Sequence, residues 1–297
     1  MNSLEDAILR TILYADVFNF PLTLPEIHHF LIATTPASLR AVEETMMRSE
    51  RLQRVLVCVN GYFMRVGREA LAETRQARET ASQSLWGNAI TWGRWLGRLP
   101  FVRMVALTGS LAVHNAVDDD DIDYIIVTAE GRVWLTRALA IVVVRLARLR
   151  GVLLCPNYVL AESALKQTRH DIFMAHEIAQ MIPVYGHNVY AAMRQANEWV
   201  ADQLPNAKSA FYPIAEGNEN RVWLGAKSGA EMLLAGRVGN ALESWERERK
   251  LRRFAPSLET RDNDARLDAQ HVKGHFNDRG NPALSRYLEY LRAFELD

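Results

Sequence analysis

Cysteine is nearly absent from this chain of 297 residues: Cys58 and Cys155 stand nearly a hundred positions apart, each in an apolar run. The sequence contains no Cys-x-x-Cys pair and no cysteine–histidine cluster with zinc-ligand spacing. These absences argue against a disulfide-stapled scaffold and a zinc-finger fold. A chain of this length can bury a sizeable core without staples. A reducing, cytoplasmic location is therefore expected.

Net charge is also lacking. Lys+Arg 35 and Asp+Glu 35 cancel, so the molecule has no strong positive field that attracts nucleic acid indiscriminately. The N-terminus, MNSLEDAILR, lacks the basic-then-apolar order of a secretory signal, and the longest apolar stretch, Ala138–Val144, stops at Arg145. We expect neither export nor a membrane partner.

The first 67 residues predict three helices followed by a β-hairpin. Apolar residues recur at helical spacing from Leu4, and a second helix is expected to begin at Thr23, with Glu26 three positions later as in a capping box. A third helix is expected over Pro36–Arg51. Asn60-Gly61 then joins two β-rich runs, which is a strong hairpin signal. This order of elements is typical of a winged helix-turn-helix domain.

Duplex DNA is not the favoured partner of this domain. The expected third helix carries Arg40 and Arg48 but also Glu43, Glu44 and Glu50, so it lacks a uniformly basic recognition face. Docking of a protein partner and support of the rest of the chain are the alternative roles.

Residues 68–165 predict an α/β core with few strands. The expected elements are a long helix ending at Pro100, strands Val102–Leu107 and Ile122–Val127, a buried helix Val133–Leu149 and a third strand Val152–Leu160. Pro156 predicts that the third strand lies at a sheet edge or carries a bulge. Residues 166–297 are expected to form an all-helical C-terminal region, interrupted by a charged loop over Ala255–Asp268.

One segment of the core carries the clearest chemical signal. A strand delivers Gly109-Ser110 to the start of a short helix, where glycine lets a phosphate approach the backbone and unpaired N–H groups favour an anion. Asp121 follows Gly109 by twelve positions and Asp123 lies two further on, within the next strand. Side chains two apart on a strand share a face, so the carboxylates are expected to lie together and to need a hard cation such as Mg²⁺. A phosphate cradle beside a divalent metal suits phosphoryl or nucleotidyl transfer.

The Gly-Ser pair, the twelve-residue step and the Asp-Ile-Asp of residues 121–123 resemble the signature of the polymerase-β-type nucleotidyltransferase superfamily. The resemblance covers approximately residues 100–165. It implies a short mixed sheet flanked by helices, with Gly109 and Ser110 holding a nucleoside triphosphate. It also implies that Asp121 and Asp123 are the catalytic residues and ligate Mg²⁺, with two ions expected. An appended helical region would complete the nucleotide and acceptor sites.

The chain departs from that signature at three points. Val113-His114 stands where minimal members carry Arg-Gly, and Asp120 replaces the serine before Asp-Ile-Asp, which adds repulsion and a further metal-binding carboxylate. The third carboxylate that the resemblance implies is missing from the strand Val152–Leu160. The polar residue there is Asn157, which cannot act as a base. Glu162, just beyond the strand, is the substitute if the strand end bends inward.

Two functions are therefore expected as alternatives. The first is a Mg²⁺-dependent nucleotidyltransferase that moves a nucleoside monophosphate from a triphosphate, ATP by expectation, to a hydroxyl of a small molecule, a protein or RNA. The second is a catalytically weak or inactive nucleotide-responsive regulator, silenced by Asn157, whose winged helix binds DNA or a protein partner. His176-Glu177 lacks the second histidine of a zinc-protease motif and predicts no further site.

Overall fold

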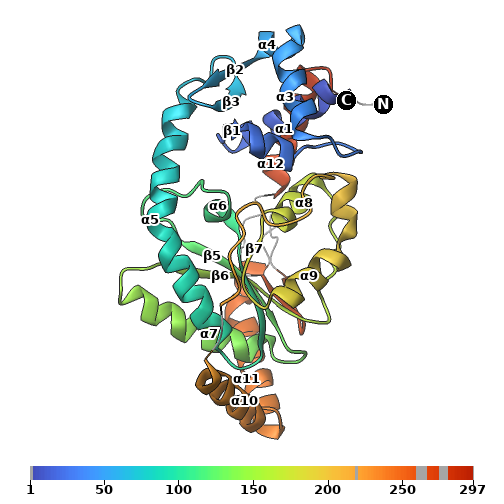
Figure 1. The fold of residues 1–297 in the computed structure, drawn as a ribbon. Coiled ribbons are helices and arrows are strands. Elements are labelled where there is room, and N and C mark those ends of the chain that lie inside the picture. Colours follow the sequence, from blue (N-terminus) through green and yellow to red (C-terminus); the bar gives the residue numbers. More distant parts are fainter. Residues whose placement is uncertain (1–2, 218–219, 259–265, 274–279, 297) are drawn as a thin grey trace.

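A computed structural model describes residues 3–217, 220–258, 266–273 and 280–296. In these ranges the chain forms a three-stranded and a six-stranded sheet surrounded by helices, so the mixed α/β class expected from the sequence is confirmed. The long helix α5 (Leu71–Gly97) runs from the small sheet down the side of the large one (Figure 1). No helix in the described part of the chain has the length and hydropathy to cross a bilayer.

Residues 3–67, here called the N-terminal module, are built from local capping and turn signals. The elements are α1 (Leu4–Val17), β1 (Leu22–Thr23), α2 (Leu24–His29), α3 (Leu39–Arg48), α4 (Glu50–Val55), β2 (Leu56–Val59) and β3 (Tyr62–Arg65). The capping box is present, because Glu26 accepts a hydrogen bond from the Thr23 backbone at 2.8 Å. Asn60 and Gly61 both have positive φ, as a tight hairpin turn requires, and β2 pairs with β3. Both local predictions are confirmed.

The expected third helix, Pro36–Arg51, is wrong as a single element. It is divided at Ser49, whose extended backbone ends α3 and whose hydroxyl accepts the Leu52 N–H at 3.1 Å to begin α4. A serine side chain that binds a backbone N–H group offers the chain an alternative to a continuous helix. The spacing of apolar residues does not reveal this, so it predicted one helix where there are two. Arg40 pairs with Glu44 within α3 at 2.7 Å, which leaves this face mixed in charge.

The six-stranded sheet has the order β7-β4-β5-β6-β9-β8. The strands are β4 (Val102–Leu107), β5 (Ile122–Thr128), β6 (Leu154–Ala161), β7 (Ile182–Tyr185), β8 (Arg266–Leu267) and β9 (His271–Lys273). Helix α7 (Val133–Arg148) connects the one parallel pair of the described sheet, β5 and β6, and the other neighbours are antiparallel. The buried face that includes Tyr124 packs against α5 and α7, whereas the face that includes Ile125 packs against the helices after β6.

This sheet corrects one expectation about strands and confirms another. The region 166–297 is not all helical, because β7 pairs with β4 and β9 pairs with β6. Both strands are too short to show the alternation of apolar and polar residues that predicts a strand. They are extended because they pair with strands that are distant in the sequence. The third core strand is not at an edge, since β6 lies between β5 and β9. It does carry the expected irregularity, a register shift at Pro156 and Asn157.

The helices after β6 are α8 (Ile172–Ala179), α9 (His187–Ala196), a 3-10 turn (Glu198–Asp202), α10 (Arg221–Leu234), α11 (Arg237–Leu258) and α12 (Gly280–Ala293). They have different neighbours: the first ones pack on the sheet, α11 packs against α7, and the last one returns to the N-terminal module. The expected loop Ala255–Asp268 overlaps the end of α11 and β8, and residues 259–265 lie outside the described residues. Helix α12 packs beside α1, and its Tyr287 and Leu291 belong to the core of the N-terminal module (Figure 1).

A buried ion network joins the N-terminal module to α5. The Arg75 guanidinium of α5 lies 2.8 Å from carboxylate oxygens of Glu26 and Glu79. It also stacks over the Phe20 ring at 4.0 Å. Because Arg75 and Glu26 are both buried and paired, the charges compensate one another and hold the module in place above the large sheet.

Candidate functional site

The Gly-Ser turn lies directly against the β5 carboxylate. After β4 ends at Leu107, the Thr108 N–H donates to the Asp123 carbonyl at 3.1 Å, and Gly109 begins the one-turn helix α6 (Gly109–Ala112) with φ +71°. A Cβ added at Gly109 would lie 2.5 Å from Asp123 Oδ2. Glycine is thus required both by the backbone angle and by the close approach of the carboxylate.

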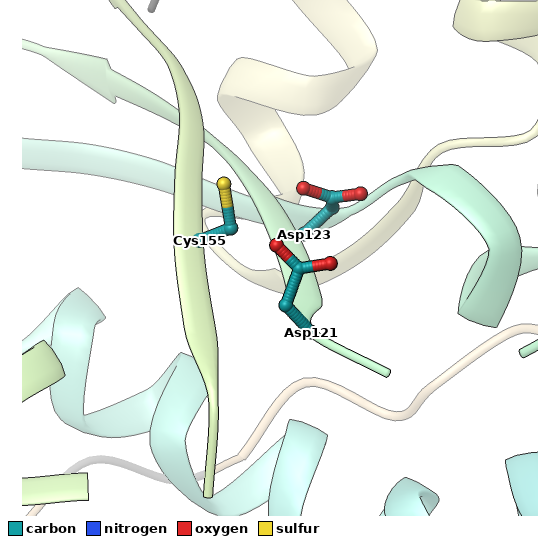
Figure 2. A group of neighbouring side chains, drawn as sticks. All are labelled: Asp121, Asp123 and Cys155. Carbon is teal, nitrogen blue, oxygen red and sulfur yellow. The ribbon is translucent and has the colours of Figure 1, made fainter. Parts of the chain in front are cut away.

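The structure brings Asp121 and Asp123 together on one side of β5 (Figure 2). Asp121 is exposed at the start of the strand and Asp123 is half-buried within it. Asp120 has a different task, because one of its oxygens accepts the Ser110 hydroxyl at 2.7 Å and the other accepts the Asp121 N–H at 3.1 Å. Asp120 therefore ties the Gly-Ser turn to the acidic loop.

Cys155 is the third member of this cluster, and sequence reasoning missed it. It lies opposite Asp123 in the β5–β6 register, and ligand atoms of Asp121, Asp123 and Cys155 all lie within 4.8 Å of one another (Figure 2). Burial, followed by the negative charges of Asp123 and Asp121, raises the pKa of the Cys155 thiol far above its usual range. The side chain beside the two aspartates is therefore a neutral thiol at pH 7.

Asn157 and Glu162, the two residues that the sequence offers as a third metal-facing group, lie within β6 and just after its end. The register shift at Pro156 moves Asn157 beyond the position opposite Asp123, into the lining of a second cavity of about 50 Å³ with Thr108 and Tyr158. Its buried Oδ1 has no hydrogen-bond partner among the described residues. Glu162 follows the far end of β6, where its N–H donates to Thr128. Glu162 follows Cys155 by seven positions, a span of ~23 Å along a strand.

Helix α8 contributes a further acidic residue, Glu177, to the two cavities beside the Thr108–Gly109 turn. Glu177 lines a cavity of about 240 Å³ together with Gly109 and Ser110, and it also lines the smaller cavity with Thr108 and Asn157. Glu177 of α8 and the Thr108–Gly109 turn therefore line the same two cavities. The sequence carried no signal for this, because α8 follows the Gly-Ser turn by more than sixty positions and only packing places it there.

His176, the neighbour of Glu177, is buried and neutral. Its ring stacks on Tyr14 of α1 with centroids 4.0 Å apart, and its Nδ1 lies 2.9 Å from the Ile172 carbonyl. Burial lowers the pKa of His176 to about 4. Because the unfolded chain takes up this proton near pH 6.5, the folded state should lose stability as pH falls from 6.5 towards 4.

We expect the free energy of unfolding to fall by about 2 kcal/mol between pH 7 and pH 5 on account of His176. Urea unfolding at both pH values measures this loss. His176→Phe keeps a ring against Tyr14 and should reduce the loss by that amount. The remaining pH dependence includes His29, whose pKa burial also lowers to about 4. An identical pH dependence in the variant and the wild type would contradict the assignment.

The cluster fits a hard divalent cation through its two carboxylates. Mg²⁺ takes one or two carboxylates and completes its shell with water and phosphate oxygens, which Asp121 and Asp123 allow. A protonated thiol is not a Mg²⁺ ligand, so Cys155 adds nothing to such a site. Once deprotonated, it would favour softer ions. Asp121 and Asp123 are therefore the residues of this cluster that suit a hard cation, and the two ions implied by the resemblance stay a prediction.

Comparisons with known proteins do not extend this picture. Neither protein-family models, nor curated proteins, nor solved structures gave a match to the chain. The geometry of the cluster and of the two cavities is thus the basis for a functional conclusion.

Proposed function

We propose that this protein binds a Mg²⁺–nucleoside triphosphate and transfers its nucleotidyl group to an acceptor hydroxyl. The observation that carries the proposal is the contact between two distant motifs: the Asp123 carboxylate lies against Gly109, and Asp121 lies beside Asp123. In this proposal the paired carboxylates supply the metal position, and the adjoining Gly109–Ser110 turn, which lines a cavity, supplies the phosphate position.

In this proposal each residue has a separate task. Asp121 and Asp123 hold Mg²⁺, which when bound neutralises charge on the phosphate oxygens. Gly109 and Ser110 provide the surface against which the triphosphate lies. Helix α6 has only one turn, so its dipole is weak. We therefore assign phosphate binding to the metal and to the backbone of Gly109 and Ser110.

Glu177 is the group that we assign as general base. The acceptor oxygen attacks the α-phosphorus, the bond to the oxygen between the α- and β-phosphates breaks, and pyrophosphate leaves with the electron pair. The acceptor proton passes to Glu177, which is the α8 carboxylate beside the Gly-Ser turn. Asn157 cannot accept it, and Glu162 lies at the far end of β6.

A second function is favoured by one observation, the thiol at position 155. A neutral Cys155 opposite Asp123 neither binds Mg²⁺ nor accepts a proton, which suits a protein that binds nucleotide without turning it over. In that case bound nucleotide would act on the N-terminal module, whose α1 lines the cavity next to Gly109. This is the nucleotide-responsive regulator.

Binding and turnover experiments separate these functions. Isothermal titration with MgATP and with ATP plus EDTA tests the site, and release of labelled pyrophosphate in the presence of candidate acceptors tests transfer. Metal-dependent binding with pyrophosphate release supports the transferase, and metal-dependent binding alone supports the regulator. Absence of metal-dependent binding would exclude both.

Cys155→Asp is expected to strengthen the metal site. A third carboxylate opposite Asp123 adds a hard ligand but also a third negative charge, so without metal the variant should melt at a lower temperature than wild type. Mg²⁺ should then raise its melting temperature more than it raises that of wild type. Turnover should rise by about tenfold or more, as expected for a restored metal contact.

Cys58→Asp is the matched control for this variant. Cys58 is exposed on β2 of the N-terminal module, away from the cluster, and the same substitution there should leave the response to Mg²⁺ unchanged. Equal responses to Mg²⁺ in wild type and Cys155→Asp would show that position 155 does not face the metal.

A further inference from the structure

The cavity that Gly109 and Ser110 line has several aromatic side chains in its wall. It measures about 240 Å³ and lies between the N-terminal module, α6 and α8. Its rings come from both sides, and they are Tyr14, Phe18, Phe20, Phe30 and Phe173. An apolar cavity of about 150 Å³ is enough to hold benzene, so this one can hold a fused two-ring system. Aromatic side chains stack on nucleic-acid bases of every kind.

The described polar side chains of the cavity include no cationic group that would bind an anion. Among the described residues that line it there is no lysine or arginine. His176 donates from Nδ1 to the Ile172 carbonyl, so Nε2 of the neutral ring is an acceptor. Gln180 adds an amide group, which both accepts and donates hydrogen bonds. The His176 acceptor and the Gln180 amide suit a neutral ring that carries an amino group, and a wall whose described residues include no lysine or arginine does not suit a second phosphate or carboxylate.

The position of the cavity links it to the candidate phosphate site. Gly109 and Ser110 form part of its wall, so a ligand within it lies next to the turn that the Asp123 carboxylate contacts. We propose that the N-terminal module supplies the base pocket, and that the aromatic cavity takes the amino-purine ring of ATP while the phosphates lie at Gly109–Ser110. This inference rests on the proposed function and assigns α1 and α8 to nucleotide selection.

The test compares ligands that differ only in the part the cavity would hold. Titrations use MgATP, MgITP, in which a carbonyl replaces the amino group, and Mg-tripolyphosphate, which has no base. The affinity of wild type for MgATP should exceed its affinity for MgITP by about tenfold or more, because the amino group makes a hydrogen bond. It should exceed the affinity for Mg-tripolyphosphate by at least as much, because the base stacks on the aromatic side chains.

Two variants alter the cavity in opposite ways. Phe18→Ala removes a ring from the cavity wall, and the side chain of Phe18 is 37% exposed. Ala15→Leu places a larger side chain of α1 inside the cavity. Each should weaken MgATP binding by about 5- to 150-fold, the range of one base–aromatic stack. Unchanged Mg-tripolyphosphate binding would show that each variant is folded. Leu39→Ala, a 42% exposed residue of α3 outside the cavity wall, is the control and should change neither affinity.

The outcomes distinguish this inference from the proposed function. If Mg-tripolyphosphate binds wild type as tightly as MgATP does, or if both cavity variants keep full MgATP affinity, the base pocket is overturned and the metal-phosphate site stands. If MgITP binds as well as MgATP, recognition of the amino group is overturned. If neither MgATP nor Mg-tripolyphosphate binds wild type, the proposed function fails and the base pocket fails with it.

Discussion

Asp123→Asn should lower the affinity for MgATP by at least ~100-fold, because the loss of a direct metal ligand should cost at least as much as the 10- to 100-fold typical of outer-shell partners. Asp121→Asn should act in the same direction. Titration calorimetry with MgATP measures both losses, and ATP with EDTA gives the metal-free baseline. Affinity in the variants should fall to that baseline.

The melting temperatures of Asp123→Asn and Asp121→Asn distinguish a metal-binding role of the two carboxylates from a structural one. The two carboxylates repel one another, so removing one charge should leave the melting temperature without metal unchanged or higher. Asp118→Asn removes an exposed charge from the same acidic run, outside the cluster of metal-ligand atoms, and should change neither affinity nor stability. A structural role for the pair would give the opposite pattern, with markedly lower stability without metal and normal MgATP binding.

Glu177→Gln should reduce turnover by about 10²- to 10⁴-fold, the usual contribution of a general base. The amide keeps the size and polarity of the side chain, so MgATP affinity should stay within about threefold. Single-turnover rates of pyrophosphate release measure the effect, and titration checks binding.

Glu162→Gln is the control for the general base. Glu162 follows the far end of β6, where its backbone binds Thr128, and its substitution should leave the rate unchanged. A rate lost in Glu162→Gln and retained in Glu177→Gln would move the base to Glu162 and require the end of β6 to rearrange. Unchanged rates in both variants would show that neither carboxylate takes the acceptor proton.

Local chemistry within a few residues was readable from the sequence. Thr23 and Glu26 satisfy each other's backbone groups, and Asn60-Gly61 adopts the positive φ that a tight turn needs, so neither requires tertiary context. The strand at Val102–Leu107 was predicted with its final limits, because an apolar run stops at a glycine turn. The spacing of Asp121 and Asp123 predicted a shared face for the same reason, since the period of a strand is local.

Register and packing decided what the sequence alone could not. Cys155 stands opposite Asp123 because the irregularity at Pro156 begins only after it, and a shift of one residue exchanges the faces of a strand. Strands β7 and β9 form through hydrogen bonds to partners far away in the chain. Glu177 lines the same cavity as the Gly-Ser turn because α8 packs there. Helix α12 completes the core around α1 through side-chain packing between distant segments. The sequence by itself thus determined the turns, the caps and the acidic pair, whereas long-range pairing and burial determined which side chains surround that pair.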